Sequence, residues 1–168
     1  MTPVIIALGS NLGDRLDIVQ AGVDAITKLP GVEVMGVSPV YETAPVGGPE
    51  QPDYLNAVLA ARTTLPPPEL LDRLHEIETA AGRAREVRWG ARTLDLDIIA
   101  YGQVRSDEPE LTLPHPRAAE RAFVLAPWHD LDPSAVLPGS GPVADLLAAL
   151  GPDHGDVRRT NLTLRVRT

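Results

Sequence analysis

The 168-residue chain contains no cysteine and no long apolar run. Without cysteine, zinc–thiolate sites, thiol nucleophiles and a disulfide scaffold are excluded. No stretch of about 18 apolar residues is present, and residues 1–8 lead directly into a strand-like segment, so we expect a cytoplasmic protein with no membrane partner.

Basic residues are also scarce, because 15 lysines and arginines stand against 23 acidic residues, a formal net charge of −8. Binding to nucleic acid depends on basic surface that displaces counterions. The composition therefore argues against nucleic acid as a partner, and a polyanionic ligand would require a local cluster of cations.

The remaining composition is that of an ordinary globular protein, with 43% hydrophobic and 23% charged residues. A chain of this length buries a sizeable core without metal or disulfide support. Because it contains no internal repeat and no dividing linker, we expect residues 1–168 to form one domain. No strongly apolar stripe requires a second copy, so we expect a monomer.

Hydrophobic periodicity predicts the order strand, helix, strand, strand, helix, strand in the first part of the chain. The strands are expected at residues 3–8, 32–43, 54–63 and 94–101, and the helices between residues 14 and 30 and between residues 66 and 82. This order is typical of the α+β ferredoxin-like fold, an antiparallel sheet with helices packed on it. A C-terminal α/β elaboration is expected to follow, with a strand and turn at 111–116, helices at 117–125 and 142–150, and a last strand containing Leu162, Leu164 and Val166.

Two aspartates, Asp95 and Asp97, lie two residues apart in the last strand of the predicted sheet. They therefore project from one face and can share a hard cation such as Mg²⁺. Alternatively they belong to a solvated strand face, because exposed alternation is common in antiparallel sheets.

The loop before this strand is unusually basic for an acidic protein. Residues 82–92 contain four arginines and one glutamate, with Trp89 among them. Cations beside a carboxylate pair match a Mg²⁺-polyphosphate, in which metal and guanidinium groups share the oxygens. The alternatives are surface salt bridges for the arginines, and packing of Trp89 against the sheet instead of over a ligand.

Two other segments are candidates for phosphate contact. Residues 9–13, GSNLG, lie between a strand and a helix, where phosphate-binding loops also lie. They match neither the Walker A nor the dinucleotide pattern, so we expect a tight turn there. His115, flanked by two prolines, is either structural or a donor to a phosphate oxygen.

Longer strings of residues resemble one known family. The strings are ALGSNLG at residues 7–13, YETAP at 41–45, QPDYLN at 51–56, RWGARTLDLDI at 88–98, LPHPR at 113–117 and RAFVL at 121–125. In this order they resemble the 6-hydroxymethyl-7,8-dihydropterin pyrophosphokinase family of folate biosynthesis, over about residues 4–140.

The resemblance implies transfer of pyrophosphate from ATP, the co-substrate, to 6-hydroxymethyl-7,8-dihydropterin, giving AMP and the pterin diphosphate. Two Mg²⁺ ions would be held by Asp95 and Asp97. Residues with a catalytic role would be Arg83, Arg92, Asp95 and Asp97. Those that contact the pterin would be Thr43, Ala44, Pro45, Val46, Tyr54, Asn56, Trp89 and Phe123. Those that contact ATP would be His75, Glu78, Arg85, Arg88, Trp89, Arg92, Ile98, Thr112, His115 and Arg121.

The sequence departs from the family pattern in three places. Glu110 stands where some members carry a basic residue, the loop lacks a lysine that others have near Glu86, and Pro116 replaces an aromatic residue. Nucleotide affinity would then depend more heavily on the remaining arginines. The tail at residues 151–168 lies outside the family core, and the resemblance implies no role for it.

Two other functions are compatible with the same residues. Ferredoxin-like sheets also serve as ligand-sensing modules without catalysis, and ligand binding would then not depend on Asp95 or Asp97. A Mg²⁺-dependent phosphodiesterase would use both aspartates with water as the acceptor, and would need no pterin.

Overall fold

The computed structural model describes residues 1–44, 52–82, 93–151 and 157–167. Its centre is a six-stranded sheet in which every pairing is antiparallel. The strands are β1 (Thr2–Ser10), β2 (Val32–Val37), β3 (Tyr41–Thr43), β4 (Tyr54–Thr63), β5 (Asp95–Tyr101) and β10 (Val157–Arg159). They follow the order β10-β3-β4-β1-β5, and β2 pairs with the later part of β4. The predicted α+β class with an antiparallel sheet is confirmed.

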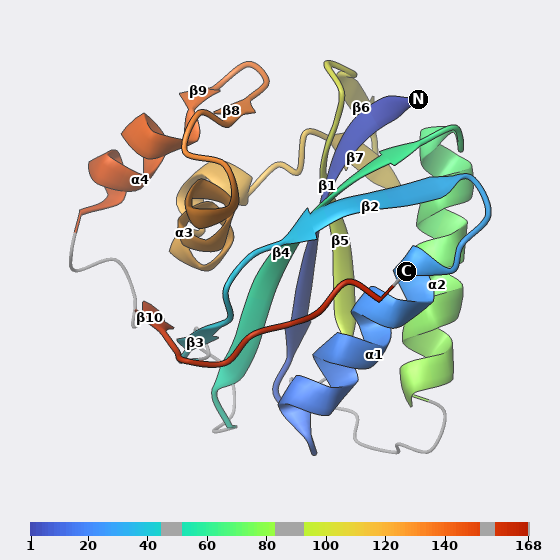
Figure 1. Ribbon diagram of the computed structural model, residues 1–168. Coiled ribbons are helices and arrows are strands. Elements are labelled where there is room, and N and C mark those ends of the chain that lie inside the picture. Colours follow the sequence, from blue (N-terminus) through green and yellow to red (C-terminus); the bar gives the residue numbers. More distant parts are fainter. Residues whose placement is uncertain (45–51, 83–92, 152–156, 168) are drawn as a thin grey trace.

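Helices cover both faces of this sheet (Figure 1). One face carries α1 (Arg15–Thr27) and α2 (Pro67–Gly82), and the other carries α3 (Ala122–Leu131), against which α4 (Val143–Leu150) packs. The short elements are the hairpins β6 (Ser106–Glu108) with β7 (Leu111–Leu113) and β8 (Val136–Leu137) with β9 (Gly141–Pro142), and the 3-10 turn η1 (Ala118–Glu120). Among the described residues, no helix combines the length and the apolar character needed to span a membrane.

Two hydrophobic cores form, because successive side chains of a strand point to opposite faces of the sheet. In the first core, Ile6 of β1 packs with Val23 of α1 and Leu74 of α2. In the second core, Val58 of β4 packs with Leu125 of α3. Beside the start of α3, the face of the second core carries polar side chains that line a cavity.

The segment expected as one strand over residues 32–43 forms two strands, β2 and β3. Pro39 has no N–H to contribute to a ladder. Ser38 instead bonds to Val58, donating its backbone N–H at 2.8 Å and accepting the Val58 N–H on its side-chain oxygen at 2.9 Å. After this break, β3 pairs with Asn56 and its neighbours at the start of β4.

Two predictions for the C-terminal part are wrong. The helix expected at residues 117–125 is the turn η1 followed by α3, because Arg121 between them has an extended backbone, with φ −112° and ψ 99°. The last strand expected around Leu164 is instead β10. After β10 the tail crosses to α1 without forming a strand, and Leu164 packs into the first core (Figure 1). The hairpin of β6 and β7 was not expected as a pair.

Candidate active site

Asp95 and Asp97 lie on a wall that two neighbouring cavities share. The first cavity, of about 470 Å³, lies beside the start of α3. The second, of about 370 Å³, lies between α2, β5 and the segment from β7 to His115. The two carboxylates thus face the junction of two spaces, as expected for residues of one strand face.

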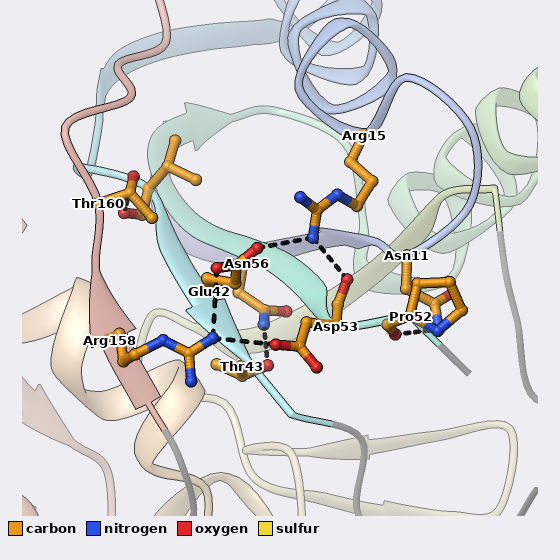
Figure 2. Close-up of polar contacts among 10 residues, drawn as sticks. Asn11, Arg15, Glu42, Thr43, Pro52, Asp53, Asn56, Arg158 and Thr160 are labelled. Atoms are coloured by element: carbon orange, nitrogen blue, oxygen red, sulfur yellow. Dashed lines mark hydrogen bonds and ion pairs between the residues drawn. The ribbon is translucent and has the colours of Figure 1, made fainter. Parts of the chain in front are cut away.

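The first cavity brings together side chains from β3, β4 and α3. Its lining includes five of the residues predicted to contact a pterin, namely Thr43, Ala44, Tyr54, Asn56 and Phe123. Asn56 Nδ2 donates a 2.7 Å hydrogen bond to Thr43 Oγ1, and both side chains are buried (Figure 2). This bond joins β3 to β4 on the wall of the cavity. The lining residues to which the sequence analysis assigned no pterin, ATP or metal contact are Ala7, Leu8, Gly9, Arg117, Glu120, Ala122, Val124 and Val157.

Gly9 lies at the centre of the polar wall. In the sheet it pairs with Asn56 on one side and with Asp95 on the other. A Cβ at this position would come within 2.8 Å of Asn56 Oδ1, so only glycine leaves Asn56 in its present rotamer. Sequence reasoning placed Gly9 in a turn, although a glycine inside a strand is a known sign of close approach by another group.

Arg121, predicted to contact ATP, lies on the wall of the first cavity. Its guanidinium carbon is 5.5 Å from the centroid of the Phe123 ring. This distance is within the range of cation–π attraction. Arg121 therefore lies beside Phe123, at the part of the first cavity that this aromatic ring lines.

The second cavity gathers the other described residues that were predicted to contact ATP. They are His75, Glu78, Ile98, Thr112 and His115. Glu78 of α2 has a structural role there, because its Oε2 accepts a 2.8 Å hydrogen bond from the backbone N–H of Leu96. Among the described residues, β5 is the edge strand at this side. Glu78 thus satisfies a backbone N–H that no described strand pairs, and it holds the backbone between the two aspartates.

His115 is held by its own backbone and by its neighbour. Its N–H donates to Ile99 O at 2.9 Å, and its ring Nδ1 accepts the N–H of Arg117 at 3.2 Å. Burial lowers the pKa of the His115 ring, and nearby Arg121 and Arg117 lower it further, against the opposing charge of Asp97. A neutral ring that accepts on Nδ1 carries its hydrogen on Nε2, which makes Nε2 a hydrogen-bond donor.

The carboxylates present suit a metal that arrives with a phosphate ligand. Within the described ranges, no group of three or more histidine, aspartate and glutamate side chains is arranged to hold a metal ion. Mg²⁺ is typically bound by one or two carboxylates together with substrate phosphates and water. The Asp95–Asp97 pair fits that donor set, and the space beside it in both cavities leaves room for the phosphates.

Comparison with known proteins identifies the family to which these features belong. Residues 5–133 match the family model described as 7,8-dihydro-6-hydroxymethylpterin-pyrophosphokinase (HPPK). The chain belongs to the HPPK family. The match includes both aspartates and the described residues that line the second cavity.

Curated HPPK relatives match most of the chain. The 2-amino-4-hydroxy-6-hydroxymethyldihydropteridine pyrophosphokinase of Pseudomonas aeruginosa is 46% identical over 146 residues, covering 87% of this chain and 90% of the relative. The Mycobacterium tuberculosis protein of the same name is 47% identical over 172 residues, covering 94% and 89%.

Solved structures of HPPK-DHPS proteins share the fold. The crystal structure of Plasmodium falciparum HPPK-DHPS wild type with pterin and p-hydroxybenzoate has a TM-score of 0.70 at 13% identity, over 88% of this chain. A structure of HPPK-DHPS in complex with substrates has a TM-score of 0.69 at 11% identity, again over 88% of this chain. The chain spans less than half of either protein, 42% and 43%.

Part of the HPPK site predicted from the sequence lies outside the described residues. These positions are Pro45, Val46, Arg83, Arg85, Arg88, Trp89 and Arg92.

The HPPK family match ends at residue 133. Of the first-cavity lining, Val157 of β10 therefore lies beyond the family match.

Proposed function

We propose that this chain transfers the pyrophosphoryl group of ATP to 6-hydroxymethyl-7,8-dihydropterin, giving AMP and the pterin diphosphate in folate biosynthesis. Membership of the HPPK family supports the activity. The observation that carries the proposal is the position of Asp95 and Asp97 between two cavities. A reaction that joins two substrates at a phosphate requires such a junction, with the charge-stabilising groups at the point where they meet.

The first cavity would hold the pterin. Tyr54 and Phe123 offer aromatic surfaces to a flat bicyclic ring. Asn56 and Thr43 offer an amide and a hydroxyl to its polar edge, and an amide can both donate and accept. The backbone around Ala44, with Pro45 and Val46, would complete this edge.

The second cavity would hold ATP. His115 would donate from Nε2 to a phosphate oxygen, with Thr112 and Ile98 beside it. His75 and Glu78 would lie at the nucleotide side. Arginines from residues 83–92, together with Arg121, would pair with the phosphates in the way that guanidinium groups usually do. Trp89 would close over both substrates and exclude water that would otherwise hydrolyse ATP.

In the reaction, the hydroxymethyl oxygen of the pterin forms a bond to the β-phosphorus of ATP. The bond between that phosphorus and the oxygen bridging to the α-phosphate breaks, AMP leaves with the bridging oxygen, and the hydroxyl proton passes to water. Asp95 and Asp97 would hold two Mg²⁺ ions, which supply neutralisation of phosphate charge when bound. Arg83 and Arg92 would stabilise the transferred group, so that catalysis consists mainly of positioning and electrostatics.

The same proposal includes the finer predictions about the whole chain. The strand order of β1 to β5, with α1 and α2 on one face, supports a ferredoxin-like assignment with a C-terminal elaboration. Residues 1–168 would then act as one pyrophosphokinase domain, as a monomer in the cytoplasm. The net charge of −8 supports small-molecule substrates over nucleic acid.

The deciding experiment is an assay of AMP with ATP, Mg²⁺ and the hydroxymethyl pterin, each also omitted in turn. We expect AMP only when all three are present. Asp97→Ala is expected to reduce the rate by at least about a hundredfold, whereas Asp145→Ala, an exposed aspartate on α4, serves as the matched control. AMP and pyrophosphate formed without pterin would support a phosphodiesterase instead. Ligand binding without turnover, unchanged by Asp97→Ala, would support a sensing module.

A further inference from the structure

The C-terminal strand β10 lies against β3 at the edge of the sheet next to the first cavity. Its three residues pair in register with β3, Val157 with Thr43, Arg158 with Glu42 and Arg159 with Tyr41. Because strand side chains alternate, Val157 shares the cavity face with Thr43, whereas Arg158 lies on the opposite face with Glu42. Val157 accordingly lines the first cavity.

Arg158 connects β3 to the residue that precedes β4. Its Nη2 lies 3.2 Å from Glu42 Oε1 and 2.9 Å from Asp53 Oδ2. Figure 2 shows Arg15 of α1 on the other side of the same pair, with Nη1 2.9 Å from Glu42 Oε2 and 2.8 Å from Asp53 O. Two arginines from opposite ends of the chain therefore hold β3 and the start of β4 together.

The segments that Arg158 joins carry the polar wall of the first cavity. Glu42 directly precedes Thr43, and Asp53 directly precedes Tyr54, two residues of the cavity lining. The wall is closed by the 2.7 Å bond from Asn56 to Thr43. A change in the distance between β3 and the start of β4 would alter that bond directly, whereas neither segment lines the second cavity.

The tail itself is anchored by contacts that do not involve Arg158. Thr160 donates to Val40 O from its backbone N–H at 3.0 Å and from its hydroxyl at 2.8 Å. Further along, Arg165 and Gln20 exchange two hydrogen bonds of 2.8 Å, and Arg167 lies 3.5 Å from Asp24. These contacts hold the tail in place beyond Arg158. We therefore expect the tail to stay bound when the Arg158 guanidinium is removed.

We propose that Arg158 is a positioning residue for the pterin cavity, acting through Glu42 and Asp53 on Thr43, Tyr54 and Asn56. This inference rests on the proposed function of the first cavity. Without Arg158, the Asp53 carboxylate loses the guanidinium that pairs it with Glu42, while Arg15 still bonds Glu42 Oε2 and the backbone carbonyl of Asp53. Repulsion between the two carboxylates then favours separation of β3 from the start of β4. The ion pairs are partly exposed, with side-chain exposures of 44% for Arg158, 29% for Glu42 and 37% for Asp53, so the effect is moderate.

The test compares Arg158→Ala, Arg158→Lys and Arg167→Ala in the full chain. Pterin affinity is measured by calorimetry with Mg²⁺ and an ATP analogue whose α,β-bridging oxygen is replaced by methylene. KM for pterin and for ATP come from the AMP assay. For Arg158→Ala we expect a rise of about threefold to tenfold in the Kd and KM for pterin, with KM for ATP changed less than about twofold.

Arg158→Lys should recover part of this loss, because it keeps the positive charge beside both carboxylates but has a shorter side chain and lacks the planar guanidinium. Arg167→Ala removes another tail arginine, one paired with α1 far from the cavity, and should leave both KM values unchanged. If Arg158→Ala fails to fold, as judged by circular dichroism, Asp53→Asn provides the same test with a smaller expected rise in pterin KM. The double variant Arg158→Ala, Asp53→Asn should lose less than the sum of the single variants.

Unchanged pterin affinity in a folded Arg158→Ala variant would overturn the inference, as would an equal change in the KM for ATP. These results are distinct from a failure of the proposed function. If the unsubstituted chain forms no pterin-dependent AMP, the proposed function is wrong. If the unsubstituted chain forms AMP normally and the Arg158 variants behave like it, the proposed function stands and only the positioning role is wrong.

Discussion

Gly9 and Asn56 face each other across β1 and β4 so closely that a Cβ on Gly9 would lie 2.8 Å from Asn56 Oδ1. The absence of a side chain on β1 thus determines where the Asn56 amide can lie. Asn56 in turn bonds Thr43, so one glycine sets the geometry of the polar wall of the first cavity.

Gly9→Ala is therefore expected to raise KM for pterin by about tenfold, because the added methyl group forces Asn56 out of its rotamer. The measurement is the AMP assay at varied pterin. Gly36→Ala is the matched control, since a Cβ there meets Leu131 Cδ1 at an ordinary 3.5 Å. Equal effects of the two substitutions would contradict this role for Gly9.

Thr43→Val is expected to weaken both stability and pterin binding. The substitution removes the oxygen that accepts from Asn56 Nδ2, and a buried donor without a partner costs about 1–3 kcal/mol. Thermal unfolding and KM for pterin measure the two effects. Thr43→Ser keeps the hydroxyl and should restore most of both. A valine variant as stable as the parent would show that the bond contributes nothing.

Glu78→Ala is expected to lower kcat by about tenfold, because it removes the acceptor for Leu96 N–H between the two aspartates. Glu78→Gln keeps a side-chain oxygen acceptor and should retain most of the rate. Glu76→Ala, on the exposed side of α2, is the control and should leave kcat unchanged. If the glutamine variant is as slow as the alanine variant, the charge of Glu78 matters more than its hydrogen bond.

Glu42 should make the free energy of unfolding depend on pH. Hydrogen bonds from Arg15 and then from Arg158 lower the pKa of Glu42 below its ordinary value of 4.5. A carboxylate with a lowered pKa in the folded state stabilises the protein above its unfolded pKa, and this stabilisation is lost as pH falls through the folded pKa.

Glu42→Gln should therefore cost about 1 kcal/mol at neutral pH and progressively less below about pH 4.5. Urea unfolding of the parent and the variant over a pH series measures the difference. A difference that is constant with pH would show that the arginines do not stabilise the ionised carboxylate.

Much of the site could be predicted because its signals are local. Asp95 and Asp97 share a face simply because a strand has a period of two residues. The strings that carry the family resemblance, such as residues 88–98, are continuous in the sequence. The order of the first strands and helices followed from hydrophobic periodicity, which depends on near neighbours.

Predictions failed where distant contacts compete with local preference. The strand expected at residues 32–43 divides because Ser38 bonds to Val58. The tail alternates in the manner of a strand around Leu164, yet that residue packs into the first core while β10 forms earlier. Local pattern cannot distinguish these outcomes, because the energies that decide them come from residues far along the chain.

The sequence by itself determined the family, the strand that carries both aspartates and about half of the residues that line the two cavities. Only the tertiary structure decided that Gly9 must lack a side chain beside Asn56, and that Arg158 meets Glu42 and Asp53 more than a hundred residues away. The physical reason is that ion pairs and close packing depend on distance in space. Formation of the sheet brings these residues together, and their separation along the chain gives no indication that they will be neighbours.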